Sequence, residues 1–263
     1  MDLQVERWFE AVAARTSRRA YELGLPEEGL LARLDRTCRE FRPFPEARVE
    51  LVRRPADGVF KGIIGSYGRV TGAPAYLAVI GDMGSPRAQE CAGYTGEGVI
   101  LEATALGFGT CWVGGFFGRD AAAAQAGLRE GENLLAISPV GIARTSLTFT
   151  DRTFKLFAGS KRRKPLEELV ESGTLPGGPV RKALEAARLA PSAYNRQPWR
   201  FRFEDGAAVI RADKADEPGK ISRRLDCGIA MLHFELGARA ASLAGSWEFL
   251  PPPDVARFTF RPA

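Results

Sequence analysis

The sequence predicts a protein of the α+β class, and three observations lead to this prediction. Segments with helical periodicity and segments with strand-like alternation both occur along the 263 residues. They follow one another without the regular strand–helix–strand alternation that indicates a parallel sheet. The hydrophobic fraction of 45% and the charged fraction of 26% are ordinary for a globular protein. We therefore expect layers of helices and sheets around one sizeable core.

The first part of the chain is expected to contain helices and strands in mixed order. In the N-terminal helix Val5 and Trp8 recur at helical spacing, and Asp2 is the expected N-cap. Gly107 ends the long helix, and Pro165 begins the short one. The elements expected here are helices at 2–14, 27–40, 86–106, 119–127 and 165–172, strands at 47–53, 75–80 and 134–141, a glycine-rich loop or irregular helix at 62–72, and an excursion without clear period at 148–157.

A linker rich in proline and glycine at 174–179 precedes a second series of elements. Two segments after it alternate as strands, and Asp205-Gly206 forms the turn between them. The elements expected after the linker are a helix at 180–190, strands at 199–203 and 208–211, a long helix at 226–244, and terminal strands at 247–249 and 257–260.

The two series echo each other weakly. In each, a helix rich in leucine and alanine is followed by a proline-bearing segment and a strand, and a long helix with small residues comes later. One diverged duplication would account for this pattern. We therefore expect two unequal halves, residues 1–175 and 176–263.

The composition argues against several classes of protein. No run of about eighteen apolar residues occurs, so no membrane span is expected. The N-terminus lacks the order of a signal peptide, and we expect a cytoplasmic location. Four scattered cysteines and one histidine offer neither a zinc motif nor a disulfide framework, so no metal is expected. That histidine, His233, is interpreted as structural because the sequence names no partner for it.

One cluster of cations stands out against a net charge of only +5. Residues 161–164 have the sequence Lys-Arg-Arg-Lys, and no aromatic residues interleave with them as binding of single-stranded nucleic acid would require. We therefore expect no nucleic-acid partner. The more specific interpretation is that these cations bind a local anion such as a phosphate. The alternative is a basic module that binds nucleic acid in a salt-sensitive way.

Cationic and hydroxyl side chains alternate directly after the first helix. In extended geometry Arg15, Ser17 and Arg19 project to one side, which presents two guanidinium groups and a hydroxyl to a phosphate. Lys161 and Arg163 repeat the alternate spacing and could meet the same phosphate. The alternative is an exposed basic loop.

A shaped turn follows the first helix of the second half. Pro191 stops that helix, and Pro198 favours extended geometry at Gln197. Ser192, Asn195 and Gln197 offer uncharged donors and acceptors, which suit the edge of a planar heterocycle. The alternative is an ordinary helix-to-strand turn whose asparagine caps the backbone.

A pair of glycines, Gly114 and Gly115, would let the backbone lie against a flat ligand, although a tight turn would also explain them. The chain has no glycine-rich dinucleotide motif, no P-loop and no nucleophile elbow. We therefore name no catalytic acid, base or nucleophile.

Taken together, these motifs resemble those of the FMN-dependent nitroreductase family. The turn is similar to Ala-Pro-Ser-x-x-Asn-x-Gln-Pro-Trp, which contacts the flavin ring there, and Arg-x-Ser-x-Arg is similar to the family's phosphate motif. Lys-x-Arg before Pro-Leu-Glu-Glu resembles a second phosphate-binding segment. Gly-x-Gly-Thr-Cys-Trp-x-Gly-Gly resembles the segment whose backbone faces the reactive edge of the flavin.

The resemblance implies a fold, a cofactor and a set of roles. The fold would have a central, mostly antiparallel sheet flanked by helices, and the cofactor would be FMN. The roles implied are phosphate binding for Arg15, Ser17, Arg19, Lys161 and Arg163, positioning of the ring for Pro191, Ser192, Asn195 and Gln197, and contact with the reactive edge for Gly114 and Gly115.

The order of the motifs departs from the usual family pattern. There the proline turn follows the Arg-x-Ser motif closely, and two identical subunits complete each site. Here residues 36–43 occupy that early place without the serine and asparagine, and the intact turn comes only after the linker. We expect the halves to act as unequal pseudo-subunits, as in the single-chain branch of the family, with one flavin per chain and a monomer sufficient to bind it.

The resemblance implies an oxidoreductase that passes hydride from NAD(P)H through FMN to a nitroaromatic, a quinone or a similar acceptor. The alternative is a flavin-binding or ligand-binding protein of the same fold without turnover.

Overall fold

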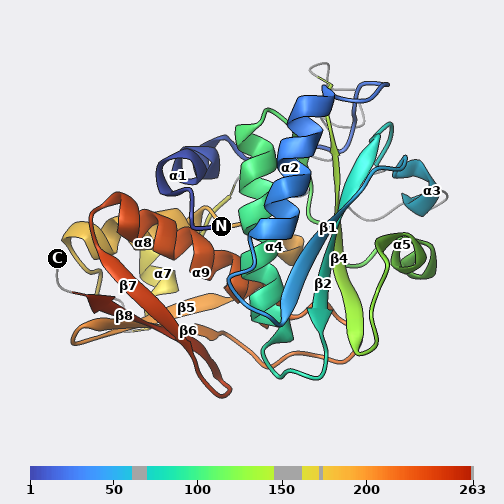
Figure 1. Cartoon of the computed structure of the whole chain (residues 1–263). Coiled ribbons are helices and arrows are strands. Elements are labelled where there is room, and N and C mark those ends of the chain that lie inside the picture. Colours follow the sequence, from blue (N-terminus) through green and yellow to red (C-terminus); the bar gives the residue numbers. More distant parts are fainter. Residues whose placement is uncertain (61–69, 145–161, 172–173, 262–263) are drawn as a thin grey trace.

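The structure is a computed structural model that describes residues 1–60, 70–144, 162–171 and 174–261 (Figure 1). In the first part of the chain the elements are α1 (Val5–Ala14), α2 (Glu28–Glu40), β1 (Ala47–Val52), α3 (Asp57–Phe60), β2 (Ala75–Asp82), α4 (Ala88–Ala105), β3 (Gly109–Thr110), α5 (Arg119–Ala126) and β4 (Glu132–Gly141). In the second part they are α7 (Leu166–Leu169), α8 (Gly178–Arg188), the 3₁₀ turn η1 (Ala193–Asn195), β5 (Trp199–Glu204), β6 (Ala207–Ala212), α9 (Arg223–Ala240), β7 (Ala244–Phe249) and β8 (Asp254–Arg261).

The described strands form two four-stranded antiparallel sheets with the same order. One sheet runs β1-β2-β4-β3 and the other β5-β6-β8-β7. Each has a long helix between its second and third strands in the chain, α4 in the first and α9 in the second. The prediction of antiparallel pairing is confirmed, but the strands divide into two sheets instead of one central sheet.

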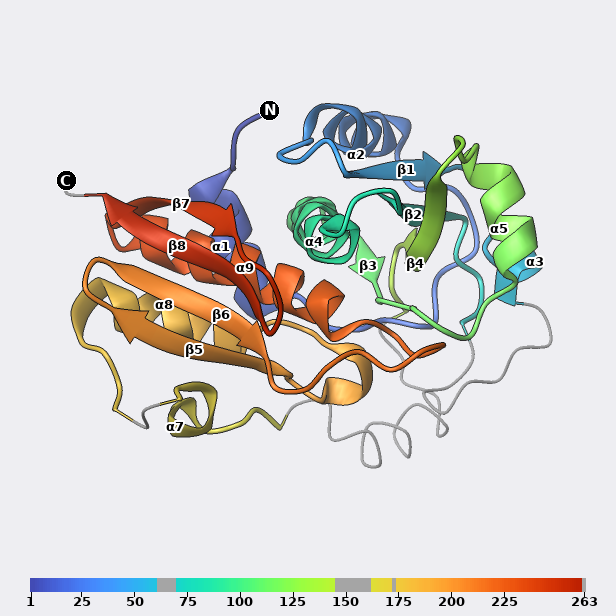
Figure 2. The ribbon, with the colours of Figure 1, turned by 90° about the horizontal axis from the view of Figure 1, so that it is seen from below.

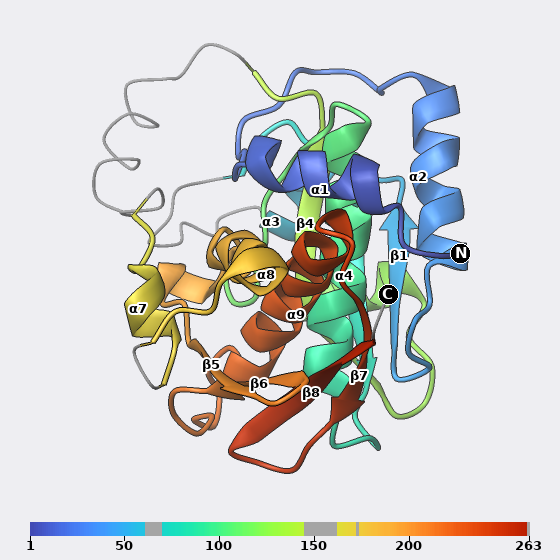
Figure 3. The ribbon, with the colours of Figure 1, turned by 90° about the vertical axis from the view of Figure 1, so that its left-hand side faces the viewer.

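The two long helices form the middle of the molecule. α4 packs on the first sheet, α9 packs on the second, and the two helices pack on each other (Figures 2 and 3). α4 is buried on nearly all sides, which explains why it lacks a clear polar face. The hydrophobic core therefore continues from one half into the other.

Two glycines allow the close contact between these helices. A Cβ atom on Gly93 of α4 would lie 2.0 Å from the carbonyl oxygen of Leu225, and one on Gly228 of α9 would lie 2.0 Å from the carbonyl oxygen of Glu90. Only glycine leaves room for backbone at that distance. The contact fixes how the halves meet, and the cavity described below lies beside it.

Several predicted boundaries were wrong. α1 begins at Val5, and its N-cap position is Gln4 without a side-chain cap, so Asp2 does not cap the helix. α9 begins at Arg223 because the Ser222 hydroxyl accepts hydrogen bonds from the next turn, and it ends at Ala240. The helix expected at 165–172 is limited to the single turn of α7. Residues 148–157 and most of 62–72 lie outside the described residues.

Candidate functional site

A cavity brings together segments that are far apart in the chain. Its walls include the segment after α1, the segment after β3, residue 163, the turn after α8 and the start of α9. The predicted site residues that line it are Arg15, Ser17, Arg19, Gly114, Gly115, Arg163, Pro191, Ser192 and Asn195. Gln197 does not line it, and Lys161 lies outside the described residues. Both halves of the chain therefore contribute to one cavity.

The segment after α1 is extended, as its alternating pattern requires. The backbone at Arg15 leaves the helix with φ −60° and ψ 125°. Ser17 then forms a parallel bridge with Thr110 of β3, and the Arg18 amide donates to the Thr110 carbonyl at 2.8 Å. Pairing with β3 thus holds the alternate side chains, those of Arg15, Ser17 and Arg19, toward the cavity.

Arg15 supplies a buried positive charge, and two of its nitrogens donate no hydrogen bond to the described residues. Its side chain is only 6% exposed, and its Nε lies 3.7 Å from Glu97 Oε1, beyond normal hydrogen-bond distance. Nε and Nη1 are buried and have no hydrogen-bond partner among the described residues. Burying guanidinium donors without partners is costly, so this arrangement favours binding of an anion.

Arg163 adds a second guanidinium at the same end of the cavity. Its Nη1 donates to Asn195 Oδ1 at 2.7 Å, and its Nη2 donates to the Leu189 carbonyl at 3.1 Å. Burial, together with the positive charges of Arg15 and Arg188, lowers the pKa of Arg163 to about 10. The group stays charged at neutral pH, and an anion between these arginines would relieve their mutual repulsion.

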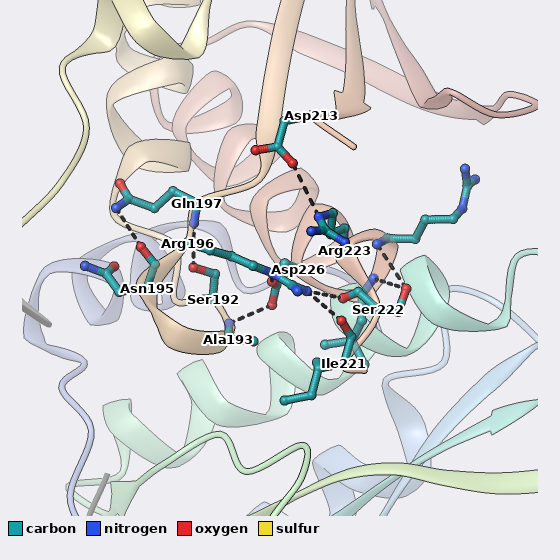
Figure 4. A network of polar contacts seen from close by, with 12 residues as sticks. Ser192, Ala193, Asn195, Arg196, Gln197, Asp213, Ile221, Ser222, Arg223 and Asp226 are labelled. Carbon is teal, nitrogen blue, oxygen red and sulfur yellow. Dashed lines mark hydrogen bonds and ion pairs between the residues drawn. The ribbon is translucent and has the colours of Figure 1, made fainter. Parts of the chain in front are cut away.

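The turn after α8 is held in an uncommon backbone conformation. Tyr194, Asn195 and Gln197 have φ values of 55°, 51° and 46°, in the left-handed region. Inside the turn the Gln197 amide N–H donates to Ser192 Oγ at 2.9 Å, and Gln197 Nε2 donates to the Asn195 carbonyl at 3.1 Å (Figure 4). These bonds fix the direction of the polar side chains that sequence analysis singled out.

Gln197 is predicted to help position the ring, but its side chain does not line the cavity and lies behind the turn. It is 3% exposed, and its Oε1 accepts a hydrogen bond from the Lys164 amide at 2.8 Å. Asn195 Nδ2 likewise donates to the Arg162 carbonyl at 2.8 Å. The turn therefore binds the backbone of residues 162–164, and this contact brings Arg163 to the cavity.

Sequence analysis missed the carboxylate that fixes the turn to the second long helix. Asp226 of α9 accepts hydrogen bonds from the Ala193 amide at 3.0 Å and from Arg196 Nε at 2.7 Å (Figure 4). Arg196 also donates to the carbonyls of Ile221 and Ser222 at 2.9 and 2.8 Å. Burial raises the pKa of Asp226 to about 6. The Ser222 cap was the available signal, since it places Asp226 in the first turn of α9.

The two glycines differ in what they contact. A Cβ on Gly114 would lie 2.9 Å from Ile221 Cδ1, whereas one on Gly115 would lie 3.9 Å from it. Gly114 therefore permits close packing between the halves, and Gly115 is the less crowded of the pair. Two exposed aromatic residues, Phe116 and Tyr194, also line the cavity, one from each half.

The site contains no feature of a metal centre or a membrane anchor within the described ranges. No group of three or more His, Cys, Asp or Glu in those ranges is placed to bind a metal ion. No helix in the described chain has both the length and the apolar character to cross a bilayer. The polar chemistry of the cavity is that of guanidinium, hydroxyl, amide and backbone groups, which suits a ligand that carries both an anionic group and uncharged polar ring atoms.

Comparison with known sequences gives one family and a partial relative. The family model described as "Putative TM nitroreductase" matches residues 7–238. The "Putative NAD(P)H nitroreductase acg" of Mycobacterium tuberculosis is 32% identical over 94 residues, which cover 32% of this chain and 28% of that protein. The chain therefore matches less than a third of the length of this curated relative.

Comparison with solved structures shows the fold. A "putative nitroreductase" from Thermotoga maritima matches 100% of this chain and 97% of its own, with a TM-score of 0.64 and 21% identity. A nitroreductase with bound FMN from Bacteroides fragilis matches 54% of this chain and 91% of its own, with a TM-score of 0.43 and 16% identity. The first of these likenesses confirms the predicted α+β nitroreductase-like fold.

Proposed function

The chain belongs to this nitroreductase family, and we propose that it is an FMN-dependent oxidoreductase that passes electrons from NAD(P)H to a small acceptor such as a nitroaromatic or a quinone. Family membership and fold support an oxidoreductase. The curated relative is described as an NAD(P)H nitroreductase, which supports the choice of reductant.

The proposal rests on the buried guanidinium of Arg15, of which two nitrogens have no hydrogen-bond partner among the described residues. The same cavity is lined by the polar turn. FMN has an anionic phosphate and a planar ring with donors and acceptors along its edge, so the residues present fit it. Arg15, Ser17, Arg19 and Arg163 would bind the phosphate, with Lys161 as a further candidate. Pro191, Ser192 and Asn195 would position the ring edge, and Gly114 and Gly115 would border its reactive side.

The protein's part in the reaction is to bind, orient and shield. When bound, FMN supplies the hydride and electron chemistry itself. The arginines would bind the cofactor by charge, and the turn beside Arg163 would add uncharged hydrogen-bonding groups. Phe116 and Tyr194 border the opening from opposite halves and offer aromatic surface to a planar acceptor.

We propose further that residues 1–175 and 176–263 act as pseudo-subunits. The equal strand order of the two sheets supports this division. So does the cavity, which takes its arginines from residues 1–175 and its turn from residues 176–263. A single chain would then provide what two subunits provide in a dimeric relative.

The test is to load the purified protein with FMN and measure oxidation of NADH and NADPH with a nitroaromatic or quinone as acceptor. We expect a yellow protein that oxidises at least one nicotinamide. Tight FMN binding without nicotinamide oxidation would favour the alternative, a flavin-binding protein without turnover. Absence of FMN binding would overturn the proposed cofactor.

A further inference from the structure

A fully buried carboxylate lies directly beneath the cavity. Glu97 of α4 accepts a hydrogen bond from Trp112 Nε1 at 2.6 Å and lies 3.7 Å from Arg15 Nε. Its other close contact is His233 of α9, whose Nε2 is 2.8 Å from Glu97 Oε1. Trp112 and Arg15 both line the cavity. One carboxylate thus connects His233, which no role above uses, to two residues of the site.

His233 has one contact at each ring nitrogen. Its Nδ1 lies 3.2 Å from the Ala186 carbonyl of α8, and its Nε2 lies 2.8 Å from Glu97 Oε1. Because a carboxylate accepts hydrogen bonds, we assign the Nε2 hydrogen to the bond with Glu97. Trp112 donates to Oε2, so both oxygens of the carboxylate have a partner.

Among the described residues, the polar contacts of the Glu97–His233 pair come from three segments. They are Arg15 after α1, Trp112 after β3 and the Ala186 carbonyl on α8. Glu97 therefore has two hydrogen-bond partners other than Arg15, the indole of Trp112 and the imidazole of His233.

The bond from His233 affects what Arg15 can bind. If Glu97 Oε1 lacked the His233 hydrogen bond, the carboxylate would draw the Arg15 guanidinium into a direct ion pair and occupy its donors. Instead, the Nε–Oε1 distance is 3.7 Å, and Arg15 Nε and Nη1 have no hydrogen-bond partner among the described residues. The charge of Glu97 orients Arg15 without consuming its donors.

We propose that His233 is a positioning residue for anion binding, which occupies Glu97 Oε1 with a hydrogen bond so that Arg15 stays available to the phosphate of the cofactor. The inference rests on the proposed function in its choice of ligand. It assigns a role to a histidine that makes no contact with the cavity. It also predicts that the effect of His233 depends on the presence of Glu97 and of a phosphate on the ligand.

The experiment compares the affinities for FMN and for riboflavin, which lacks the phosphate, in the full chain. We expect His233→Gln to lower the FMN-over-riboflavin preference about tenfold, because Glu97 then pairs with Arg15. Riboflavin affinity should change little, which a loss of folding would not reproduce. The double change Glu97→Gln with His233→Gln should restore the preference, since the competing carboxylate is gone.

An unchanged preference in His233→Gln, or no restoration in the double variant, would overturn the inference. If His233→Gln does not fold, the single variant Glu97→Gln is the test. An FMN-over-riboflavin preference equal to or above that of the wild type supports the proposed competition between Glu97 and the phosphate for Arg15. A tenfold fall in that preference contradicts it. If the wild type binds no FMN, the proposed function fails, and the same variants are scored on thermal protection by inorganic phosphate. Protection that is lost in His233→Gln and restored in the double variant supports the inference, and protection that is absent or indifferent to these changes overturns it.

Discussion

Arg15 is the residue at which the proposed cofactor binding can be tested most simply. Its guanidinium is buried, and two of its nitrogens have no hydrogen-bond partner among the described residues. We expect Arg15→Ala to weaken FMN binding by about 1.5–3 kcal/mol, the contribution of a hydrogen bond to a charged group. Quenching of flavin fluorescence during titration measures the change.

Arg18→Ala is the matched control for this prediction. Arg18 belongs to the same extended segment but does not line the cavity. Its replacement should leave FMN affinity nearly unchanged. Equal losses in the two variants would show that only the net charge of the segment matters, and an unchanged affinity in Arg15→Ala would remove its assignment.

Asp226 should make stability depend on pH in an unusual direction. Burial raises its pKa in the folded protein from 3.8 to about 6, so between these values the folded state holds a proton that the unfolded state has lost. Stability from this group is therefore present at low pH and falls as the pH rises through that window, by about 3 kcal/mol in total. This is opposite to a carboxylate whose pKa is lowered by its ion pair.

The substitution Asp226→Asn isolates this effect. The amide keeps an acceptor for the Ala193 N–H but cannot ionise. Urea unfolding at pH 4 and pH 7 should show that the variant improves relative to the wild type as the pH rises. A difference in stability that is the same at both pH values would mean that the carboxyl titrates normally.

At the scale of the elements, the crossing of α4 and α9 depends on glycine. A Cβ on Gly228 would lie 2.0 Å from the Glu90 carbonyl oxygen. The two helix backbones would have to move apart to relieve this clash. We expect Gly228→Ala to destabilise the fold by at least about 1–3 kcal/mol, the usual cost of overpacking. Denaturant unfolding followed by circular dichroism measures this cost.

Gly29→Ala provides the contrasting helical glycine. In α2 a Cβ on Gly29 would meet only the far end of the Glu27 side chain, at 3.5 Å. This change should be neutral or slightly stabilising because alanine has the higher helix propensity. If both variants lost similar stability, the loss would not come from the helix crossing.

Most elements could be predicted from the sequence because their periodicity is local. The starts of α2 and β1 and the ends of α4 and α5 follow from apolar spacing and from Gly107 and Gly127, both of which have positive φ. β3 was missed because its two residues, Gly109 and Thr110, become a strand only through pairing with β4. α9 begins three residues before the predicted Asp226 because the Ser222 hydroxyl caps the helix there.

The candidate site could be predicted only in part, for a physical reason. The residue types of the phosphate motif and the turn are visible in the chain, and the cavity contains most of them. The parts that were missed depend on tertiary contacts. Gln197 turns away to bind the Lys164 backbone, Asp226 binds the turn from another helix, and Glu97 meets His233 across the helix pair.

At the scale of the whole molecule, the two halves have different side chains in corresponding segments. The segment between α2 and β1 corresponds in order to the turn between α8 and β5. There, the Phe44 ring packs against Phe249 and Tyr94, with centroid distances of 5.1 Å to each. Aromatic side chains thus occupy this segment, where the second half has its polar turn. This asymmetry supports a single flavin site per chain.

The most direct measurement is native mass spectrometry of the FMN-loaded protein, because it counts chains and cofactors in the same particle. If both halves of one polypeptide build the site, the spectrum will contain a single chain with one FMN bound. Flavin found only in particles of two chains, or two flavins on one chain, would contradict the account.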